Sequence, residues 1–439
     1  MPDRDYHMLD PNKKRVSILN FIKHIHPVKI PLNALALSNT WGLGGMGLVL
    51  FSILILTGSL MLFVYQPFPE VAYESILTIQ QGYVFGQFIR NMHYFSATFL
   101  VIILFLHFLR VFFTGGYNGI RSFNWIIGLS IFSLILLSCF TGYLLPWDQI
   151  AYWAITISIN ILDYIPAGQW LKGFITQGYE VNAKTLQLFF TMHTTVIPGI
   201  LIIILAIHFW KIRKAKGVVT SGLKQMNDNE KPVMVDTIPN LLLKETVVGL
   251  ILIALVMSIS AFINAPLEDM ANSGLSPNPA KAPWYFAGLQ ELLLHFHPFF
   301  AAFLIPLIVV GFFVCLPFIN PDRTRNGIWF ISEKGKKTSL ISFITGLMMT
   351  PVLILADEYL FDLASLIADM PVWISSGLIP VTLMFGLLVG YHYFLKKTFN
   401  LSRAEAVQGV ITLILTVFIV LTITGIWFRG ENMKLMLAF

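Results

Sequence analysis

Two apolar stretches of the sequence decide the fold. They are RNMHYFSATFLVIILFLHFLR (90–110) and FTMHTTVIPGILIIILAIHFWKIRK (190–214). The first carries His93 and His107, fourteen residues apart, and the second carries His193 and His208, fifteen residues apart. At about 1.5 Å of rise per residue, either spacing separates the two imidazoles by roughly 21–23 Å along a helix. Each helix therefore offers one histidine near each of its ends.

The angular spacing brings the two histidines of each helix broadly to one face. Fourteen steps of about 100° return to within roughly 40° of the starting direction, and fifteen overshoot it by roughly 60°. If the helices face each other, His93 pairs with His193 and His107 with His208. A haem iron takes two axial ligands, so the pattern predicts two bis-histidine haem sites, one above the other. The alternative is four unrelated histidines bonded to neighbouring hydroxyls, but ionisable residues at membrane depth are functional by default.

The composition indicates a membrane protein. Of 439 residues, 56% are hydrophobic and only 12% are charged, with a mean hydropathy of +0.74, an apolar share above that of ordinary soluble domains. The net charge of +6 does not indicate nucleic-acid binding, because the basic residues fall in loops between spans. The polar start MPDRDYHMLDPNKKRV lacks the apolar core of a cleavable signal peptide. Cys139 and Cys315 lie far apart, and no C-x-x-C-H motif for covalent haem is present.

Nine apolar stretches are long enough to cross a membrane. They lie at about 42–65, 90–113, 123–145, 186–210, 246–265, 299–319, 339–357, 372–395 and 405–428. We expect an all-α polytopic protein, because an isolated span satisfies its backbone in lipid only as a helix. A polar basic linker, 211–245, separates the fourth and fifth spans and is the natural boundary between two halves.

The lysines and arginines are distributed unevenly between the two sides of the membrane. Loops on the side of the N-terminus hold 23 of the 29, and loops on the opposite side hold 6. The positive-inside rule then places the N-terminus in the cytoplasm and the C-terminus outside. We expect His93 and His193 to lie toward the outer face, and His107 and His208 toward the cytoplasmic face.

Glycines at the histidine period support the haem interpretation. Gly44 and Gly58 lie fourteen residues apart on the first span, and Gly128 and Gly142 fourteen apart on the third. A flat macrocycle needs neighbouring helices without a side chain where its edge passes, although glycine is also a common packing residue in membrane helices. Arg90 and Arg110 each lie three residues from a histidine and are candidates for haem propionates; the alternative is that they only reach to the interface.

With these residues in place, the sequence resembles the cytochrome b of quinol:cytochrome c and quinol:plastocyanin oxidoreductases. The histidine pairs, the four glycines, R-x-x-H at Arg90, H-x-x-R at Arg110 and GYLLPWDQIAYWA (142–154) carry the resemblance, which is dense over roughly 38–217 and looser over 236–320. The fifteen-residue spacing and PWDQ (146–149) are closer to the plastid and Firmicute type than to the mitochondrial type.

The resemblance implies cofactors, partners and a location. It implies two non-covalent b haems, a Rieske iron–sulfur protein, a c-type cytochrome subunit, quinol and quinone as substrates, a homodimer and a place in the cytoplasmic membrane of a prokaryote. It also implies a division into a cytoplasmic arm (1–38), a di-haem domain (39–217), a cytoplasmic linker (218–245) and a quinol-site domain (246–335). The remaining residues, 336–439, hold additional transmembrane helices of unknown role.

Three departures from the family pattern matter. The plastid type has a cysteine before L-G-G on the first span that tethers a third haem; this chain has Gly42 there, so we expect no such tether.

The family marks its outer quinol site with Pro-Glu-Trp-Tyr, whereas KAPWYFAGLQELL keeps Trp284 and Tyr285 but has Pro283 at the acid's position. Quinol oxidation releases protons and needs a base, and Glu291 is the nearest carboxylate after the motif. Finally, the chain joins two halves that the plastid type makes as separate polypeptides, and it has one span more than the mitochondrial type.

The implied mechanism is bifurcated quinol oxidation at the outer face. One electron would pass to the Rieske centre and the other across the two haems to a quinone near the cytoplasmic face, with protons released outside and taken up inside. For this inner site the sequence offers Arg213, Lys216 and Asp236, which could equally be positive-inside charges and their neighbours.

Two other functions stay open at this point. A di-haem anchor of a non-Rieske oxidoreductase would pass electrons to or from the quinone pool without bifurcation, and the altered quinol motif and the extra span keep it in view. A transporter with histidine proton relays would have no haem and would show broken helices or inverted repeats. No inverted repeat is visible in the sequence.

Overall fold

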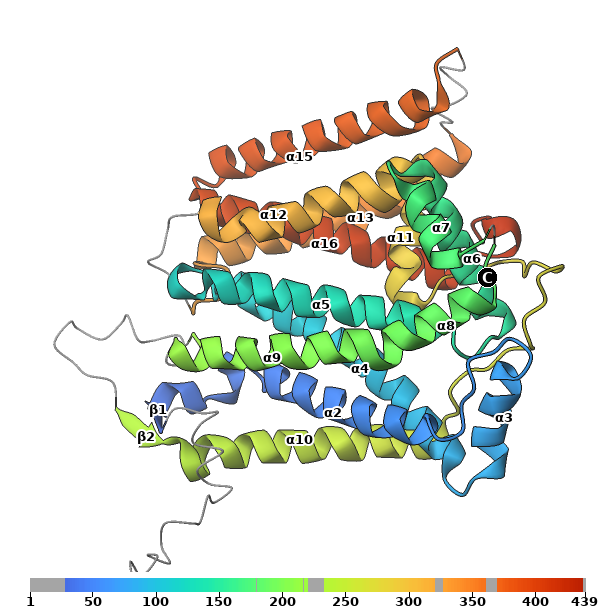
Figure 1. Ribbon diagram of the computed structural model, residues 1–439. Coiled ribbons are helices and arrows are strands. Elements are labelled where there is room, and N and C mark those ends of the chain that lie inside the picture. Colours follow the sequence, from blue (N-terminus) through green and yellow to red (C-terminus); the bar gives the residue numbers. More distant parts are fainter. Residues whose placement is uncertain are drawn as a thin grey trace, which may run out of the picture.

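The computed structural model describes residues 28–178, 180–215, 217–219, 233–319, 327–360 and 369–436. Within these ranges, nine helices are long and apolar enough to cross a membrane. They lie side by side (Figure 1). The prediction of an all-α polytopic fold with about nine spans is confirmed.

The spans and their flanking elements have the following bounds. The spans are α2 (Leu43–Met61), α4 (Gly86–Phe113), α5 (Ser122–Tyr143), α8–η6–α9 (Ala183–Thr191, Met192–Val196, Ile197–Lys214), α10 (Thr237–Phe262), η7–α12 (Phe299–Leu304, Ile305–Ile319), α13 (Glu333–Tyr359), η8–α15 (Ile374–Leu378, Ile379–Thr398) and α16 (Arg403–Trp427). The shorter elements are β1 (Lys29–Pro31), η2 (Leu32–Leu35), η3 (Leu37–Asn39), α3 (Ala72–Gly82), η4 (Gly119–Arg121), α6 (Gln149–Asn160), η5 (Ile161–Tyr164), α7 (Gly168–Thr176), β2 (Met234–Asp236), α11 (Trp284–His295) and η9 (Glu431–Met433).

The two ends of the bundle carry different short elements. At one end, which we name the β end, β1 pairs antiparallel with β2, with Lys29 opposite Asp236. The opposite end carries α3, α6 and α7 and is named the α7 end (Figure 1). The chain passes from α9 through β2 into α10 at the β end, and α11 lies at the α7 end.

Three of the spans contain a π-helical turn that ends two residues before a proline. The turns are η6, η7 and η8, and the prolines are Pro198, Pro306 and Pro380. A proline inside a helix removes one i→i−4 hydrogen bond and its ring clashes with the carbonyl of residue i−4. A π-turn widens the helix by one residue and so relieves that clash, which explains why these spans do not run as continuous α-helices.

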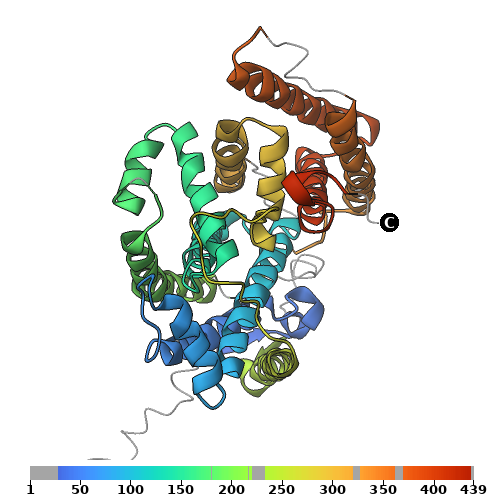
Figure 2. The ribbon, with the colours of Figure 1, turned by 90° about the vertical axis from the view of Figure 1, so that its right-hand side faces the viewer.

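The main apolar core lies between the first five spans. Its buried members come from α2, α4, α5, α9 and α10, and include Leu50, Leu100, Ile131, Leu201 and Val256. On the other side of the bundle, α16 packs along α13 and against α11, while α15 lies at the edge farthest from α10 in both views (Figures 1 and 2).

Candidate functional site

The π-turn η6 puts the two histidines of the fourth span in phase with those of the second. His193 lies within η6, and His208 lies on the regular helix α9. An i→i+5 turn takes up one extra residue without advancing the helix by the usual 100°. The fifteen-residue spacing therefore acts as a spacing of fourteen, which is the spacing of His93 and His107 on α4.

The rings of His93 and His193 lie at a separation that suits a shared metal, with their planes at 69° to each other. Their centroids are 6.2 Å apart. Two metal–imidazole bonds of about 2 Å each, added to the half-widths of the two rings, require about 6 Å between centroids. Their Nδ1 atoms are already occupied: His93 Nδ1 lies 2.9 Å from Thr57 Oγ1, and His193 Nδ1 lies 2.9 Å from the Ser138 carbonyl oxygen. Such bonds fix the tautomer and direct Nε2 to the metal.

The second pair, His107 and His208, lines a cavity between α2, α4, α5 and α9. The empty space measures about 1320 Å³, counting its open mouth. Apolar side chains such as Leu100, Leu104 and Leu205 form its walls. His208 Nδ1 is buried without a hydrogen-bond partner in the described part of the chain. An apolar cavity lined by two imidazoles fits a haem better than a bare metal ion.

The side chains available as metal ligands also favour a haem over a bare metal ion. No group of three or more histidine, cysteine, aspartate or glutamate side chains that could hold a metal ion occurs among the described residues. The histidines instead come as pairs. Two axial ligands are what an iron already held by a macrocycle requires, whereas a bare ion would need three or four protein ligands.

Each of the four predicted glycines lies against one histidine. A Cβ atom at Gly142 would be 2.4 Å from His193 Cε1, and one at Gly58 would be 3.2 Å from His93 Cε1. The corresponding distances are 3.5 Å from Gly44 to His107 and 3.6 Å from Gly128 to His208. In the structure, these glycines make room for the imidazole rings themselves. Clearance for the edge of the macrocycle stays a prediction.

Arg90 and Arg110 are buried rather than extended to the interface. Arg90 donates to the carbonyl oxygens of Ala265 and Pro266, at 2.8 and 2.6 Å. Arg110 donates to the carbonyl oxygens of Asn39 and Val219, at 2.7 and 2.8 Å. Arg110 also lines the His107/His208 cavity. The propionate role of both arginines stays a prediction, and the structure adds that each ties its helix to a loop.

The candidates for an inner quinone site lie on different elements of the structure. Arg213 lies in the last turn of α9, and Asp236 ends β2, where it pairs with Lys29; Lys216 lies outside the described residues. Two further basic residues line the His107/His208 cavity: Arg121, which donates to the Ala215 and Gly217 carbonyls at 3.1 Å, and Lys211. The sequence analysis missed both, because a basic residue at a span's end looks the same whether it faces a cavity or water.

The outer quinol motif opens helix α11. Trp284 and Tyr285 pack against the main core, beside Cys139 of α5. The Nε1 atom of Trp284 is buried without a partner among the described residues. Burial raises the pKa of the Tyr285 hydroxyl far above its usual range, with Tyr143 and Tyr94 as further nearby groups. Trp284 and Tyr285 therefore place two neutral polar groups in a dry environment.

Glu291 lies farther along α11, in a buried ion pair. Arg429 Nη2 lies 2.6 Å from Glu291 Oε1. Burial alone would raise the pKa of this carboxyl, but hydrogen bonds and charge from His295 and Arg429 hold it below its ordinary value. A carboxylate held ionised in this way is a poor proton acceptor at neutral pH. The role of Glu291 as a base stays a prediction. Its partner Arg429 lies 138 residues away along the chain, so nothing in the sequence indicated the contact.

Comparisons with known proteins show what this chain is similar to. The family model Cytochrome b/b6/petB matches residues 30–216. The cytochrome b6 of Heliomicrobium gestii is 39% identical over 172 residues, which are 39% of this chain and 81% of that protein. The cytochrome b subunit of the cytochrome bc complex of Chlorobaculum thiosulfatiphilum is 32% identical over 284 residues, 64% of each chain.

The fold has a solved counterpart. A chain of a hyperthermophilic respiratory Complex III superposes with a TM-score of 0.68, covering 95% of this chain and 98% of that one at 21% identity. At this identity the match shows the fold alone. The family model and the sequence relatives, of which the cytochrome b6 of Heliomicrobium gestii is covered over 81% of its length, show that this chain belongs to the cytochrome b/b6 family.

Proposed function

We propose that this chain is the di-haem subunit of a quinol:cytochrome c-type oxidoreductase that contributes to the proton motive force. The observation that carries the proposal is the 6.2 Å separation of the His93 and His193 rings, with a glycine against each ring. One b haem would be held by His93 and His193, and the other by His107 and His208. When bound, each haem supplies one-electron redox chemistry.

The chain's own residues prepare both haem sites. Thr57 and the Ser138 carbonyl hold the Nδ1 atoms of His93 and His193. Apolar side chains form most of the second site around His107 and His208, and Arg110 offers it one buried positive charge. Because the two histidine levels on α4 lie fourteen residues, or about 21 Å, apart, the two sites together span most of a membrane of about 30 Å.

We place the outer quinol site at the start of α11. Trp284 Nε1 is a buried donor without a described partner, so it is suited to a quinol or quinone oxygen. Tyr285 beside it keeps its proton because of burial, so it also acts as a donor. For an inner quinone site we infer that the basic cavity mouth at Arg121 and Lys211 joins the predicted Arg213 and Asp236 as a candidate.

The proposed orientation follows the charge distribution. The β end carries the chain's basic loops, including the last turns of α9 and α15 with Lys211, Lys214, Lys396 and Lys397. We infer that the β end faces the cytoplasm of a prokaryote and that the α7 end faces outward. The proposed partners are a Rieske iron–sulfur protein, a c-type cytochrome and a second copy of this chain.

The decisive measurement is a dithionite-minus-ferricyanide spectrum of the detergent-purified complex, with pyridine-haemochrome quantification and identification of its subunits. Two b haems per chain together with a Rieske protein are expected. Two b haems without a Rieske protein would favour the di-haem quinone-linked anchor, which Pro283 at the position of the family's acid keeps under consideration. A preparation without haem would refute the assignment of the four histidines.

Single-histidine variants assign the two haems. Replacing His93 by leucine removes one ligand of the α7-end site, and replacing His107 by leucine removes one ligand of the β-end site. Each variant is expected to lose one of the two haem signals and to keep the other. His392, which lies near the β end of α15, supplies the matched control: His392→Leu is expected to leave both signals unchanged.

A further inference from the structure

The helix with the proposed quinol motif rests on the last span of the chain. Gly288 of α11 faces α16 so closely that a Cβ atom there would be 2.5 Å from Thr422 Oγ1 and 2.9 Å from the Phe418 ring. Gly425 of α16 also lies close to α11, because a Cβ atom there would be 2.9 Å from the Ala287 carbonyl oxygen. A glycine on each helix thus lets the two backbones approach closely.

The loop before α11 is tied to the end of the same span. Lys281 Nζ donates to the Ile426 carbonyl oxygen at 2.9 Å. Asn278 Nδ2 donates to Asn432 Oδ1 at 3.0 Å. The quinol motif at 283–286 is therefore held by α16 and its terminal segment on both sides, through the loop that precedes it and through the helix that follows it.

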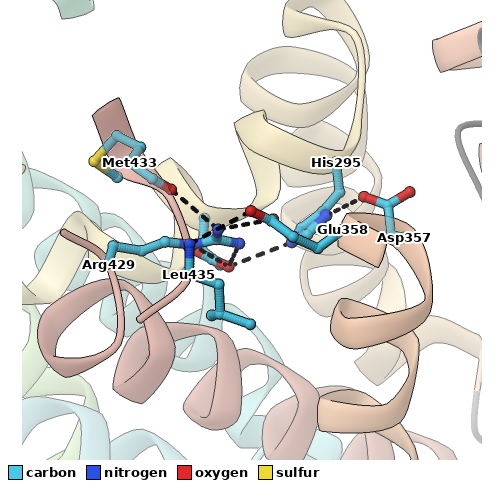
Figure 3. Close-up of polar contacts among 7 residues, drawn as sticks. His295, Asp357, Glu358, Arg429, Met433 and Leu435 are labelled. Atoms are coloured by element: carbon cyan, nitrogen blue, oxygen red, sulfur yellow. Dashed lines mark hydrogen bonds and ion pairs between the residues drawn. The ribbon is translucent and has the colours of Figure 1, made fainter. Parts of the chain in front are cut away.

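A buried ion pair completes this attachment. Arg429 and Glu291 are exposed by only 1% and 0%. The Arg429 Nε and Nη2 atoms donate to both carboxylate oxygens of Glu291, at distances between 2.6 and 3.1 Å. Figure 3 shows that Arg429 also reaches Glu358 of α13 and the Met433 carbonyl oxygen, at 2.9 and 3.0 Å. The guanidinium thus joins three segments of the chain.

The same network extends to the surface through His295. Its Nε2 lies 3.3 Å from Glu291 Oε1. Its Nδ1 lies 2.6 Å from Asp357 Oδ2 (Figure 3). Such a chain of groups could carry a proton outward or could hold α11 in place. The bidentate contact with Arg429 favours the second role, because it keeps Glu291 ionised and leaves neither of its oxygens free.

We propose that Arg429 is a positioning residue of the outer quinol site, which acts by fixing Glu291 and hence the Trp284–Tyr285 turn of α11. The terminal segment 403–436 then belongs to the quinol site, although it contributes no group that touches the substrate. This inference rests on the proposed function.

The test compares four variants in the purified whole complex. They are Arg429→Met, Arg429→Lys, Glu291→Gln and the double variant Glu291→Gln/Arg429→Met. The measurement is the rate at which the complex oxidises menadiol, a soluble quinol, with an oxidised c-type cytochrome as the electron acceptor. Each menadiol gives two electrons to two cytochromes and releases two protons, and KM and kcat for menadiol are obtained across a pH series. Lys172→Met is the matched control, because it breaks the Lys172–Asp163 ion pair at the same α7 end of the bundle but leaves the residues of α11 unchanged.

We expect Arg429→Met and Glu291→Gln each to raise KM on the order of tenfold, because small displacements of a positioning group are costly. The haem spectra and the pH profile should stay as in the unmodified protein. Arg429→Lys should recover part of the loss. The double variant should lose less than the product of the two single effects, because it leaves no unpaired buried charge. Lys172→Met should match the unmodified protein.

Two results would overturn the inference. An unchanged KM in Arg429→Lys and Glu291→Gln would do so, and these two variants decide the matter even if Arg429→Met fails to fold. A lower kcat at constant KM with an altered pH profile in Glu291→Gln alone would instead make Glu291 the proton acceptor. Failure of menadiol to reduce the unmodified protein would be a different outcome, since it removes the proposed function itself.

Discussion

At the residue scale, the four glycines are graded by how closely they approach the histidines. The distance from the added Cβ to the ring rises from 2.4 Å at Gly142 through 3.2 Å at Gly58 to 3.5 and 3.6 Å at Gly44 and Gly128. A distance under 3 Å requires one of the two groups to move. The His193 ring is held at Nδ1 by the Ser138 carbonyl, so its movement would shift the proposed iron ligand.

Gly142→Ala is therefore expected to weaken or abolish haem binding at the α7 end while the β-end haem stays. The overpacking costs about 1–3 kcal/mol, and it falls directly on a ligand. Redox difference spectra and haem quantification of the purified variant measure the effect. Gly128→Ala, which adds only an ordinary contact, should bind both haems. Gly45→Ala is the control, since nothing lies within 4 Å of an added Cβ there. Equal effects at all three positions would contradict this account.

The protonation of His295 predicts how stability depends on pH. Burial alone would lower its pKa, but hydrogen bonds to Asp357 and Glu291 raise it from 6.5 to about 9. A pKa that is higher in the folded state stabilises the protein fully below the unfolded value, and this contribution is lost as pH rises through the folded value. The full shift corresponds to about 3 kcal/mol, which solvent around the half-exposed Asp357 reduces to about 1–2 kcal/mol.

We accordingly expect the melting temperature of the detergent-solubilised protein to fall between about pH 6.5 and pH 9.5. His295→Gln should remove much of this fall, because its amide keeps a polar contact but does not titrate. Thermal unfolding followed by tryptophan fluorescence at both pH values provides the measurement. His392→Gln, a histidine of α15, is the control. A His295→Gln variant with the same pH dependence as the unmodified protein would show that His295 is not the group responsible.

Sequence reasoning at this scale identified the histidines and glycines because their chemistry is local. Two spacings on two spans were sufficient to predict the pairs, and the structure places those pairs together. It did not identify Arg429, because an arginine after the last span carries no sign of a carboxylate 138 residues away. For the same reason Glu291 was interpreted from its proximity to the motif and not from its partner.

At the scale of elements, the π-turn η6 makes the two histidine-bearing spans equivalent. The sequence showed fifteen residues between His193 and His208, which an ideal α-helix would carry past the partner face by roughly 60°. Sequence periodicity did not predict the turn itself, because periodicity assumes one helical pitch. Pro198 was the available signal, and η7 before Pro306 and η8 before Pro380 show the same arrangement.

Deleting Thr195, an exposed residue of η6, is expected to preserve both haems. Removal of one residue converts the π-turn to an α-turn and leaves the flanking helices in phase. Deleting Ile203, an exposed residue within regular helix α9, is the matched control. It rotates His208 by about 100° relative to His193. Spectra of the first variant should show two haems, and spectra of the second should lack at least one. Loss of haem in both variants would refute the phasing role.

At the scale of the whole molecule, noncovalent contacts hold the two halves of the chain together. Asn91 of α4 donates to the Ser260 carbonyl of α10 at 2.9 Å and accepts from Ala265 N at 2.8 Å. Arg90 adds its two bonds to the same loop. The linker between α9 and β2 is therefore one connection among several between the two halves. In the plastid type that the sequence resembles, the two halves are separate polypeptides and have no such linker.

Cutting the chain within 220–232 and producing both pieces together should therefore yield an assembled cytochrome with two haems. Copurification of a tagged first half with the second half is the measurement. Asn91→Leu removes two buried hydrogen bonds worth about 1 kcal/mol each. It should reduce copurification in the cut protein and have little effect on haem content in the intact chain. Halves that never associate would show that the linker is required.

The transmembrane spans were interpreted to different depths along the chain. Nine spans, the all-α fold and the family were predicted correctly from hydropathy and motifs. The last spans were described only as additional helices, because an apolar helix does not reveal in its own sequence which neighbour it will contact. In the structure, α16 joins both ends of the bundle: Gln408 donates to the Phe113 carbonyl at 3.3 Å, and Arg429 binds Glu291.

The fixed position of the His93 and His193 rings has a consequence for the rate of electron transfer. When a metal changes its oxidation state, ligands that are free to move must relax, and that reorganisation slows the transfer. Here Thr57 and the Ser138 carbonyl hold the Nδ1 atoms of both imidazoles, and Gly58 and Gly142 lie against the rings. A haem iron held by these two imidazoles, as proposed, would gain and lose an electron with little rearrangement, since the protein would already impose the geometry that both states share.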